Sequence, residues 1–135
     1  MEGNAHDIER DDPFGGAYGA ALAVRAGDFL FTTVAGVERL DDGEPVFAAT
    51  FEQQLRLVGE HLVRRLRHFG CGLDAVVDAT VWVHPSVEIE AGQLLDTLHG
   101  EVFRGAVPTV SFIRSPLLYP EALIGLKAVA YAPRP

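Results

Sequence analysis

Histidine and cysteine side chains are the first candidates for chemistry in this sequence, because they bind metals and serve as acids, bases and nucleophiles. The chain has one cysteine, Cys71, which excludes an internal disulfide and a metal site built from several cysteines. The histidines show neither metal-ligand spacing nor an H-E-x-x-H motif. They are His6, His61, His68, His84 and His99. The sequence therefore predicts no metal and no other cofactor.

Motifs for nucleophilic serines and for phosphate binding are also missing. The sequence contains no G-x-S-x-G elbow, which would expose a nucleophilic serine. Gly15-Gly16 precedes an expected strand rather than a helix, so it is not a phosphate-binding loop. Glu52, Glu60 and His84 could form an acid–base set, but nothing in the sequence brings them together. Any site must therefore come from polar side chains that the fold gathers.

A long amphipathic helix is predicted over residues 51–69. Its apolar residues recur every three or four positions, which places them on one face. They are Phe51, Leu55, Val58, Leu62, Leu66 and Phe69. Thr50 and Gln53 have the spacing of a capping box, and Gly70 is placed to end the helix. The basic cluster at residues 64–67 lies on this helix, where we expect a solvent-exposed face.

Two strands before this helix are expected to form a hairpin. Residues 20–24 and 29–37 are rich in apolar, β-branched and aromatic side chains. Residues 25–28 between them have the composition of a turn. The acidic stretch at residues 41–45 (DDGEP) is expected to be a loop, because glycine and proline interrupt it.

Three strands and a second helix are expected in the C-terminal half. In strand 76–83, odd-numbered positions share one face and even-numbered positions share the other. Ser86 is a plausible N-cap for a helix that runs to about Phe103, with acidic residues in its first turn. Strands at 109–113 and 123–131 complete the order β-β-α-β-α-β-β.

This order describes an α+β fold in which two helices cover one face of a mixed sheet. A chain of 135 residues has the length of a single domain, which we place at residues 1–135. Several strands carry apolar residues on both faces. We therefore expect the second face of the sheet to be buried against other subunits.

The composition limits the class of partner. Lys and Arg number 11 and Asp and Glu number 19, so the formal net charge of −8 argues against nucleic acid as a partner. The longest apolar runs are far shorter than the roughly 20 residues that span a membrane, so no membrane partner is expected. Residues 1–13 are polar and acidic, unlike a signal peptide. They are expected to form a disordered or loosely attached segment of a cytoplasmic protein.

Four stretches of the sequence resemble the RidA/YjgF family of reactive-intermediate deaminases. They are Gly16-Ala17-Tyr18, residues 24–31 (VRAGDFLF), residues 73–83 (LDAVVDATVWV) and residues 107–111 (VPTVS). The resemblance covers about residues 14–131. It implies a chorismate-mutase-like α+β fold and a homotrimer with a small-molecule site in each inter-subunit cleft.

Four positions depart from the family pattern at the site that the resemblance implies. Val110 stands where the family's arginine grips the substrate carboxylate with its planar fork. Losing such a hydrogen bond to a charged group costs about 1.5–3 kcal/mol, or roughly 10- to 100-fold in affinity. Gly125 replaces a glutamate that is thought to position the hydrolytic water, and Lys127 replaces a second glutamate. Phe112 adds bulk where the family often has a small residue.

The polar groups that remain define the candidate site. The catalytic residues that we expect are Ser111, Tyr18 and Lys127. The substrate-binding residues that we expect are Thr33, Gln93, Val110, Phe112, Arg114 and Gly125. Strand alternation is expected to direct them into one largely apolar inter-subunit pocket, with Lys127 or Arg114 replacing the missing cation.

Each polar candidate also has a structural alternative. Lys127 could blunt the edge of a sheet, and Arg114 could pair with a surface carboxylate. Ser111 could hydrogen-bond to the backbone of a neighbouring strand. Tyr18 fits a core position as well as a pocket, and Trp82 fits packing under a helix or at a trimer interface.

Three functions follow, in decreasing order of preference. The first is a hydrolase for an imine, enamine or related labile nitrogen compound, with weak or no activity on 2-imino acids. Such a reaction needs a donor that polarises the C=N bond and a positioned water. The second is a non-catalytic trimer that binds a small ligand or has a regulatory role. The third is an endoribonuclease, which the acidic net charge supports least.

Overall fold

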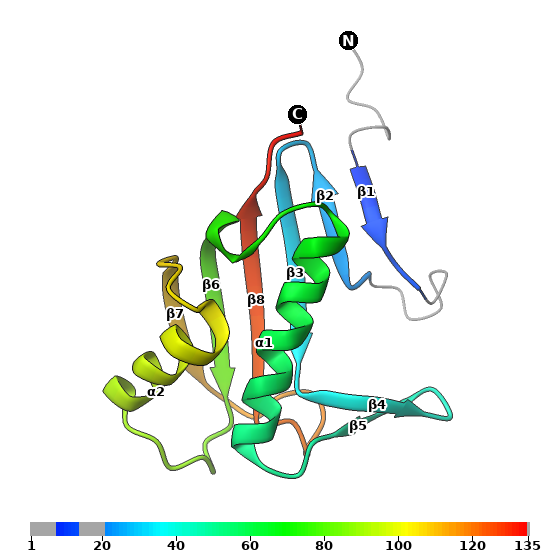
Figure 1. The fold of residues 1–135 in the computed structure, drawn as a ribbon. Helices are drawn as coiled ribbons and strands as arrows, with labels where there is room; N and C mark the ends of the chain where they lie inside the picture. Colours follow the sequence, from blue (N-terminus) through cyan, green and yellow to red (C-terminus); the bar gives the residue numbers. More distant parts are fainter. Residues whose placement is uncertain (1–7, 14–20, 135) are drawn as a thin grey trace.

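A six-stranded mixed sheet forms the centre of the computed structural model, which describes residues 8–13 and 21–134. The spatial order of the strands is β1-β2-β3-β8-β6-β7 (Figure 1). They are β1 (Ile8–Asp11), β2 (Ala23–Ala26), β3 (Phe29–Ala35), β6 (Val76–Val83), β7 (Thr109–Arg114) and β8 (Ile124–Tyr131). The pairing of β6 with β7 is parallel and the other pairings are antiparallel. The sheet is therefore mixed, as predicted.

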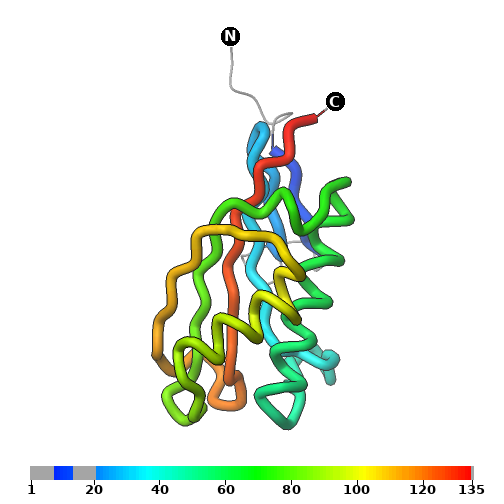
Figure 2. The backbone as a smooth tube through the Cα atoms, turned by 60° about the vertical axis from the view of Figure 1, so that its left-hand side comes forward, coloured from blue at the N-terminus to red at the C-terminus, as the bar shows by residue number. Residues whose placement is uncertain are grey.

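Two helical segments cover one face of this sheet (Figures 1 and 2). They are α1 (Phe51–His68) and α2 (Ala91–Thr97), which continues as the π-helical turn η3 (Leu98–Phe103). A short 3₁₀ turn, η2 (Leu73–Ala75), leads into β6. The main core lies between the helices and the sheet and includes Leu30, Leu62, Val81 and Leu126. The predicted α+β fold, with helices on one face of the sheet, is confirmed.

The start of α1 has the predicted capping box. The hydroxyl of Thr50 accepts a hydrogen bond from the backbone N–H of Gln53 at 3.2 Å. The Gln53 side chain accepts one from the Thr50 N–H at 3.3 Å. The helix ends at His68, one residue before the predicted limit.

Replacing Thr50 with Ala is expected to lower the free energy of unfolding by about 1 kcal/mol, because an N–H at the start of α1 loses its acceptor. Urea unfolding followed by circular dichroism measures this change. Thr50→Ser keeps the acceptor and should stay near the wild-type value. Equal stability of the Ala and Ser variants would contradict the role given to the cap.

Residues 8–11 form an edge strand, which corrects the expectation of a loosely attached segment there. β1 pairs with β2 through four residue pairs, from Ile8 with Ala26 to Asp11 with Ala23. β2 itself begins later than predicted and includes residues 25 and 26, which had the composition of a turn. The turn is tighter, and Gly27 takes the positive φ of +59° that it requires.

The acidic stretch at residues 41–45 forms a hairpin, so the predicted loop is wrong. Strand β4 (Val37–Asp41) pairs with β5 (Glu44–Phe47) around Asp42 and Gly43, whose φ angles are +50° and +80°. Two central residues with positive φ are typical of a tight hairpin turn. The predicted strand 29–37 also ends early, at Ala35. The next residue, Gly36, lies so close to α1 that a Cβ atom there would collide with the Gln54 side chain.

Ser86 does not cap the second helix, which begins at Ala91 after Glu90. The backbone N–H of Ser86 donates instead to Nδ1 of His84 at 3.0 Å. The carbonyl oxygens of Val87 and Ile89 accept hydrogen bonds from Arg114, each at 2.6 Å. These carbonyls are held by a side chain on β7, so a contact distant in sequence fixes the nonhelical path before α2.

A bulge in β6 changes the predicted alternation at one end of the strand. The ladder with β8 shifts register between Val76 and Asp78. Val76 is buried and Val77 is 45% exposed, the reverse of the prediction that Val77 shares a face with Ala79. From Asp78 onward the predicted alternation holds.

Among the described residues, no helix has the length and apolar character to cross a membrane.

Candidate functional site

The face of the sheet turned away from the helices, the open face, carries a row of four polar side chains. Thr33 on β3 is the ladder partner of Lys127 on β8. Lys127 is also paired with Thr80 on β6, and Thr80 is paired with Ser111 on β7. Because ladder partners point to the same side of a sheet, the four side chains form a line across four strands. We call this line the polar row.

The side chains of the polar row have no hydrogen-bond partner among the described residues. Thr33, Lys127 and Ser111 are exposed and Thr80 is half-buried. Neighbouring strands lie about 4.8 Å apart, so the row from Thr33 to Ser111 spans about 14 Å. A small molecule lying across β8 and β6 could contact an ammonium group and several hydroxyls. Three of the predicted site residues are therefore brought together on one face.

Asp78 is the carboxylate nearest to this row along β6. It lies two residues before Thr80 on the same face and pairs with Val129 on β8. This places it diagonal to Lys127, at a typical separation of about 7–8 Å. One of its oxygens accepts a hydrogen bond from the Thr109 hydroxyl at 2.5 Å. Sequence reasoning placed Asp78 on the correct face but did not name it as a site residue.

Apolar side chains surround the polar row on the open face. Phe29, Phe31, Ile113 and Tyr131 are each between 40% and 49% exposed. The rings of Phe29 and Tyr131 pack against each other with centroids 5.4 Å apart. Exposed apolar side chains grouped on one face are typical of an interaction surface.

Val110, Phe112 and Arg114 lie on the opposite side of β7 from Ser111. Their ladder partners on β6, in the same order, are Ala79, Val81 and Val83, which are buried beneath the helices. Lys127 and Gly125 belong to the open face, because they alternate with buried residues of β8. Within one chain, therefore, these two sets cannot line one pocket. They could meet only where two copies of the chain are in contact.

Val110 lies in an apolar environment. It packs against the core and lines a small cavity of about 130 Å³ with Phe112, Leu98 and Phe103. Arg114 lies farther along β7, and both of its terminal nitrogens donate to backbone carbonyls before α2. This arginine therefore holds a loop in place, and its structural partners are carbonyls rather than the surface carboxylate considered above.

Two further predicted residues have separate surroundings. Gly125 is buried, and a Cβ atom there would lie 2.7 Å from the side chain of Leu117, so a larger residue would displace Leu117. Gln93 is exposed on α2 and lines a cavity of about 170 Å³ with residues of α1. Tyr18, a predicted catalytic residue, lies outside the described residues.

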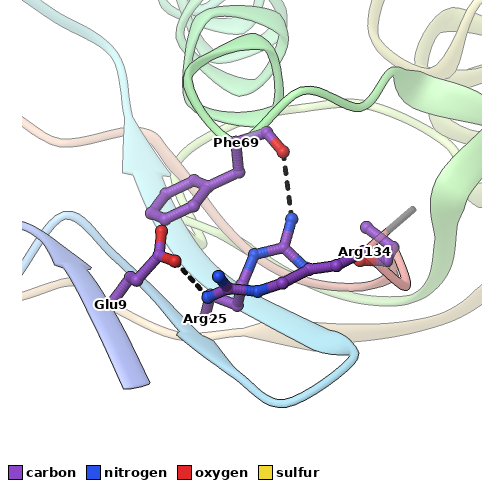
Figure 3. Close-up of polar contacts among 5 residues, drawn as sticks. Glu9, Arg25, Phe69 and Arg134 are labelled. Atoms are coloured by element: carbon purple, nitrogen blue, oxygen red, sulfur yellow. Dashed lines mark hydrogen bonds and ion pairs between the residues drawn. The ribbon is translucent and has the colours of Figure 1, made fainter. Parts of the chain in front are cut away.

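Arg25 on β2 links the end of α1 to the segment that follows β8 (Figure 3). It is 5% exposed and donates to the carbonyl of Ala132. It also donates, at 3.0 Å, to the carbonyl of Phe69 (Figure 3). Glu9 and Arg134 form an ion pair beside it. These residues and Cys71 line an open cavity of about 780 Å³. Because Arg25 is already bonded to carbonyls at the end of α1 and after β8, we assign it a structural role.

Neither a thiol nucleophile nor a metal centre is indicated in the part of the chain that the structure describes. Burial raises the pKa of the Cys71 thiol, which keeps it protonated near neutral pH. Its sulfur lies 3.5 Å from the carbonyl of Leu66. No group of three histidine, cysteine or acidic side chains is placed to hold a metal within residues 8–13 and 21–134.

Solved structures with the same architecture come from the YjgF/YER057c/UK114 family. A family member from Mycobacterium tuberculosis matches 93% of this chain and 99% of its own at 20% identity, with a TM-score of 0.71. A yjgF family member from Streptococcus pyogenes matches 99% of this chain and all of its own at 23% identity, with a TM-score of 0.70. A candidate endoribonuclease from Thermotoga maritima matches 94% of this chain and 97% of its own at 24% identity, with a TM-score of 0.70.

No family model matches the sequence, and no curated protein matches it. The structural matches nevertheless span nearly the whole chain. This chain therefore has the YjgF-type α+β fold. The resemblance noted in the sequence is confirmed at the level of the fold, while activity, substrate and assembly rest on the residues of the site.

Proposed function

We propose that this chain binds small, labile nitrogen compounds of the imine or enamine class at the polar row and hydrolyses them. The observation that carries the proposal is the line of Thr33, Lys127, Thr80 and Ser111 across the open face. Their polar side-chain atoms have no partner among the described residues, which leaves them available for a ligand. A ligand site commonly combines an apolar surround with a few convergent polar groups, and this face has both.

The proposed active form is a homotrimer with its sites between subunits. The exposed aromatic residues of the open face favour burial against further copies of the chain. Val110, Phe112 and Gln93 lie on the helix side of the edge strand β7 or on α2, away from the polar row. A second copy that presents this edge to the open face would complete a cleft with an apolar wall.

The proposed reaction adds water to a C=N bond and releases ammonia. The Lys127 ammonium donates a proton to the imine nitrogen, which makes the carbon more electrophilic. Water attacks that carbon, a C–O bond forms, the π electrons move to nitrogen, and Asp78 accepts a proton from the water. The protonated Asp78 carboxyl donates its proton to the amine nitrogen of the resulting carbinolamine, and the neutral Lys127 amine accepts the hydroxyl proton. The C–N bond then breaks as the C=O bond forms, and a carbonyl compound and ammonia leave with Asp78 and Lys127 in their starting charge states. Thr33, Thr80 and Ser111 orient the substrate and water by hydrogen bonds.

The same site should discriminate against 2-imino acids. A substrate carboxylate is best held by a planar guanidinium. Val110, which stands where the family has its carboxylate-binding arginine, offers only an apolar side chain. Arg114 is on the same strand but is already bonded to two carbonyls. Neutral imines avoid the cost of placing a carboxylate beside an apolar wall.

The Asp78→Asn variant tests the proposed proton acceptor. A neutral imine is generated in situ by an amine oxidase acting on benzylamine, and ammonia release is compared with the rate in buffer. The protein-dependent rate of the variant should be at least about 100-fold lower than that of the wild type, which is the usual scale of general acid–base catalysis. Asp74→Asn, at an exposed carboxylate in η2, is the matched control and should keep wild-type activity.

Two results would contradict this proposal. Equal rates for the wild type and Asp78→Asn would remove Asp78 from the mechanism. If the wild type binds benzylamine or benzaldehyde but does not accelerate hydrolysis of the imine, a non-catalytic ligand-binding trimer would be favoured. The polar row itself contains no carboxylate that could act as a base, which suits a protein that binds its ligand without turning it over. Cleavage of RNA by the purified protein would instead favour the activity considered for the Thermotoga maritima neighbour.

A further inference from the structure

Asp78, the proposed proton acceptor, directly follows the bulge in β6. The ladder between β6 and β8 shifts register between Val76 and Asp78, and β7 pairs with β6 only from Asp78 onward. Val77 therefore has no ladder partner on either neighbouring strand of the described sheet. Bulges often lie beside active sites, where they change the direction of a side chain. The Asp78 carboxylate thus leaves the strand at a point where regular pairing is interrupted.

A threonine on β7 contacts both residues of this irregular point. Thr109 is the ladder partner of Asp78, so the two side chains lie on the same face of the sheet. The Thr109 hydroxyl lies 3.2 Å from the carbonyl oxygen of Val77 and 2.5 Å from Oδ1 of Asp78. A hydroxyl has one proton, and the carboxylate is the closer acceptor and the charged one. Hydroxyl-to-carboxylate bonds are typically about 2.5–2.7 Å long, so Thr109 donates to Asp78.

This bond engages one oxygen of the carboxylate and leaves the other available. Oδ2 of Asp78 has no hydrogen bond within the part of the chain that the structure describes. Asp78 is half-buried, so its carboxylate is in contact with solvent. The side chain of Thr109 is β-branched, which restricts its χ1 rotamers and holds the hydroxyl in place. The carboxylate is therefore fixed through Oδ1 and presents Oδ2 to a reacting group.

We infer that Thr109 is a positioning residue that orients the Asp78 carboxylate for the proposed hydrolysis, on which this inference rests. Its hydroxyl holds Oδ1, so that Oδ2 takes the proton from the attacking water and returns it to the amine nitrogen. Thr109 keeps its own proton throughout and acts only through Asp78. Orientation of this kind matters for the rate, because misplacing a catalytic group by about 1 Å can cost about 100-fold.

Thr109→Val tests this role, because it keeps the shape of the side chain and its preference for a strand but removes the donor. With the benzylamine-derived imine, kcat should fall about 10-fold, since a hydrogen bond to a charged group is lost. KM should stay unchanged, because the polar row is intact. Thr109→Ser restores the donor and should recover most of the rate. Thr97→Val, which removes a hydroxyl bonded to a carbonyl on α2, is the control and should keep the wild-type rate.

A double-mutant cycle with Asp78→Asn separates positioning from a general structural role, and thermal unfolding reports whether each variant folds. If Thr109 acts through Asp78, Thr109→Val should lower the rate no further once Asp78→Asn is present. An equal loss in both backgrounds would overturn the inference, and so would a wild-type kcat in Thr109→Val. Failure of the proposed function has a different result. The wild type would then give no acceleration, or Asp78→Asn would keep the full rate, and the role of Thr109 would be refuted with it.

Discussion

Replacing Lys127 with Met is expected to reduce imine turnover by about 100- to 1,000-fold, the usual effect of removing one donor that stabilises charge in the transition state. Lys127 is the cation that the strands β3, β8, β6 and β7 place on the open face. Its ammonium has no partner among the described residues, so its loss leaves no buried group unpaired. The effect should therefore appear in turnover rather than in folding.

The measurement is ammonia release from the benzylamine-derived imine, combined with thermal unfolding and light scattering. Lys127→Met should unfold within a few degrees of the wild type and have the same molar mass. Lys127→Arg keeps a cationic donor and should retain part of the activity. Arg10→Met removes an exposed cation on the edge strand β1 and serves as the matched control. Full activity in Lys127→Met would exclude the assigned role.

Replacing Gln54 with Leu is expected to give the largest loss of stability. Gln54 is fully buried near the start of α1. Its Nε2 donates to the carbonyls of Ala48 and Glu121, both at 2.9 Å. Its Oε1 accepts from the N–H of Leu123 at 2.8 Å. One side chain thus joins α1 to the segment before it and to the loop that enters β8.

Leucine has nearly the same shape but satisfies none of these groups. Each buried group left unpaired costs about 1–3 kcal/mol, so a total loss of about 3–9 kcal/mol is expected. This is a large share of the roughly 5–15 kcal/mol that stabilises a typical domain. Urea unfolding measures the change, with the exposed Glu52→Gln as the control. A loss below about 1 kcal/mol would show that the three bonds contribute little.

Gln54 also helps to position Lys127 in the polar row. Leu123 directly precedes β8, whose register places Lys127 between Thr33 and Thr80. Holding the start of β8 therefore helps to fix the position of the ammonium group. Any partial loss of activity in Gln54 variants that still fold would be expected to follow the loss of stability.

The local elements with strong sequence signals were predictable. The capping box and apolar stripe of α1 gave its limits to within one residue, and the β-branched runs located β3, β6, β7 and β8. The hairpin around Asp42 and Gly43 was missed because acidic residues and a proline outweighed its Asp-Gly turn signal. The late start of α2 was not predictable, since it depends on carbonyls held by Arg114.

The candidate site was predictable only in part. Strand alternation shows which residues share a face of one strand, and this placed Val110 with Arg114 and Gly125 with Lys127. Whether those two faces coincide depends on strand order and register, which a single sequence does not specify. The polar row became visible only when the ladders set Thr33, Lys127, Thr80 and Ser111 in line. Arg65 on α1 is half-buried, whereas sequence reasoning had treated the basic cluster at residues 64–67 as solvent-exposed.

The substrate preference of the wild-type protein tests the account most directly. Ammonia release is measured side by side from the benzylamine-derived imine and from 2-iminopropanoate generated by an amino acid oxidase. The protein should accelerate hydrolysis of the neutral imine and leave the 2-iminopropanoate rate close to that in buffer. Rapid hydrolysis of 2-iminopropanoate, with no acceleration for the neutral imine, would contradict the site described for Lys127 and Val110.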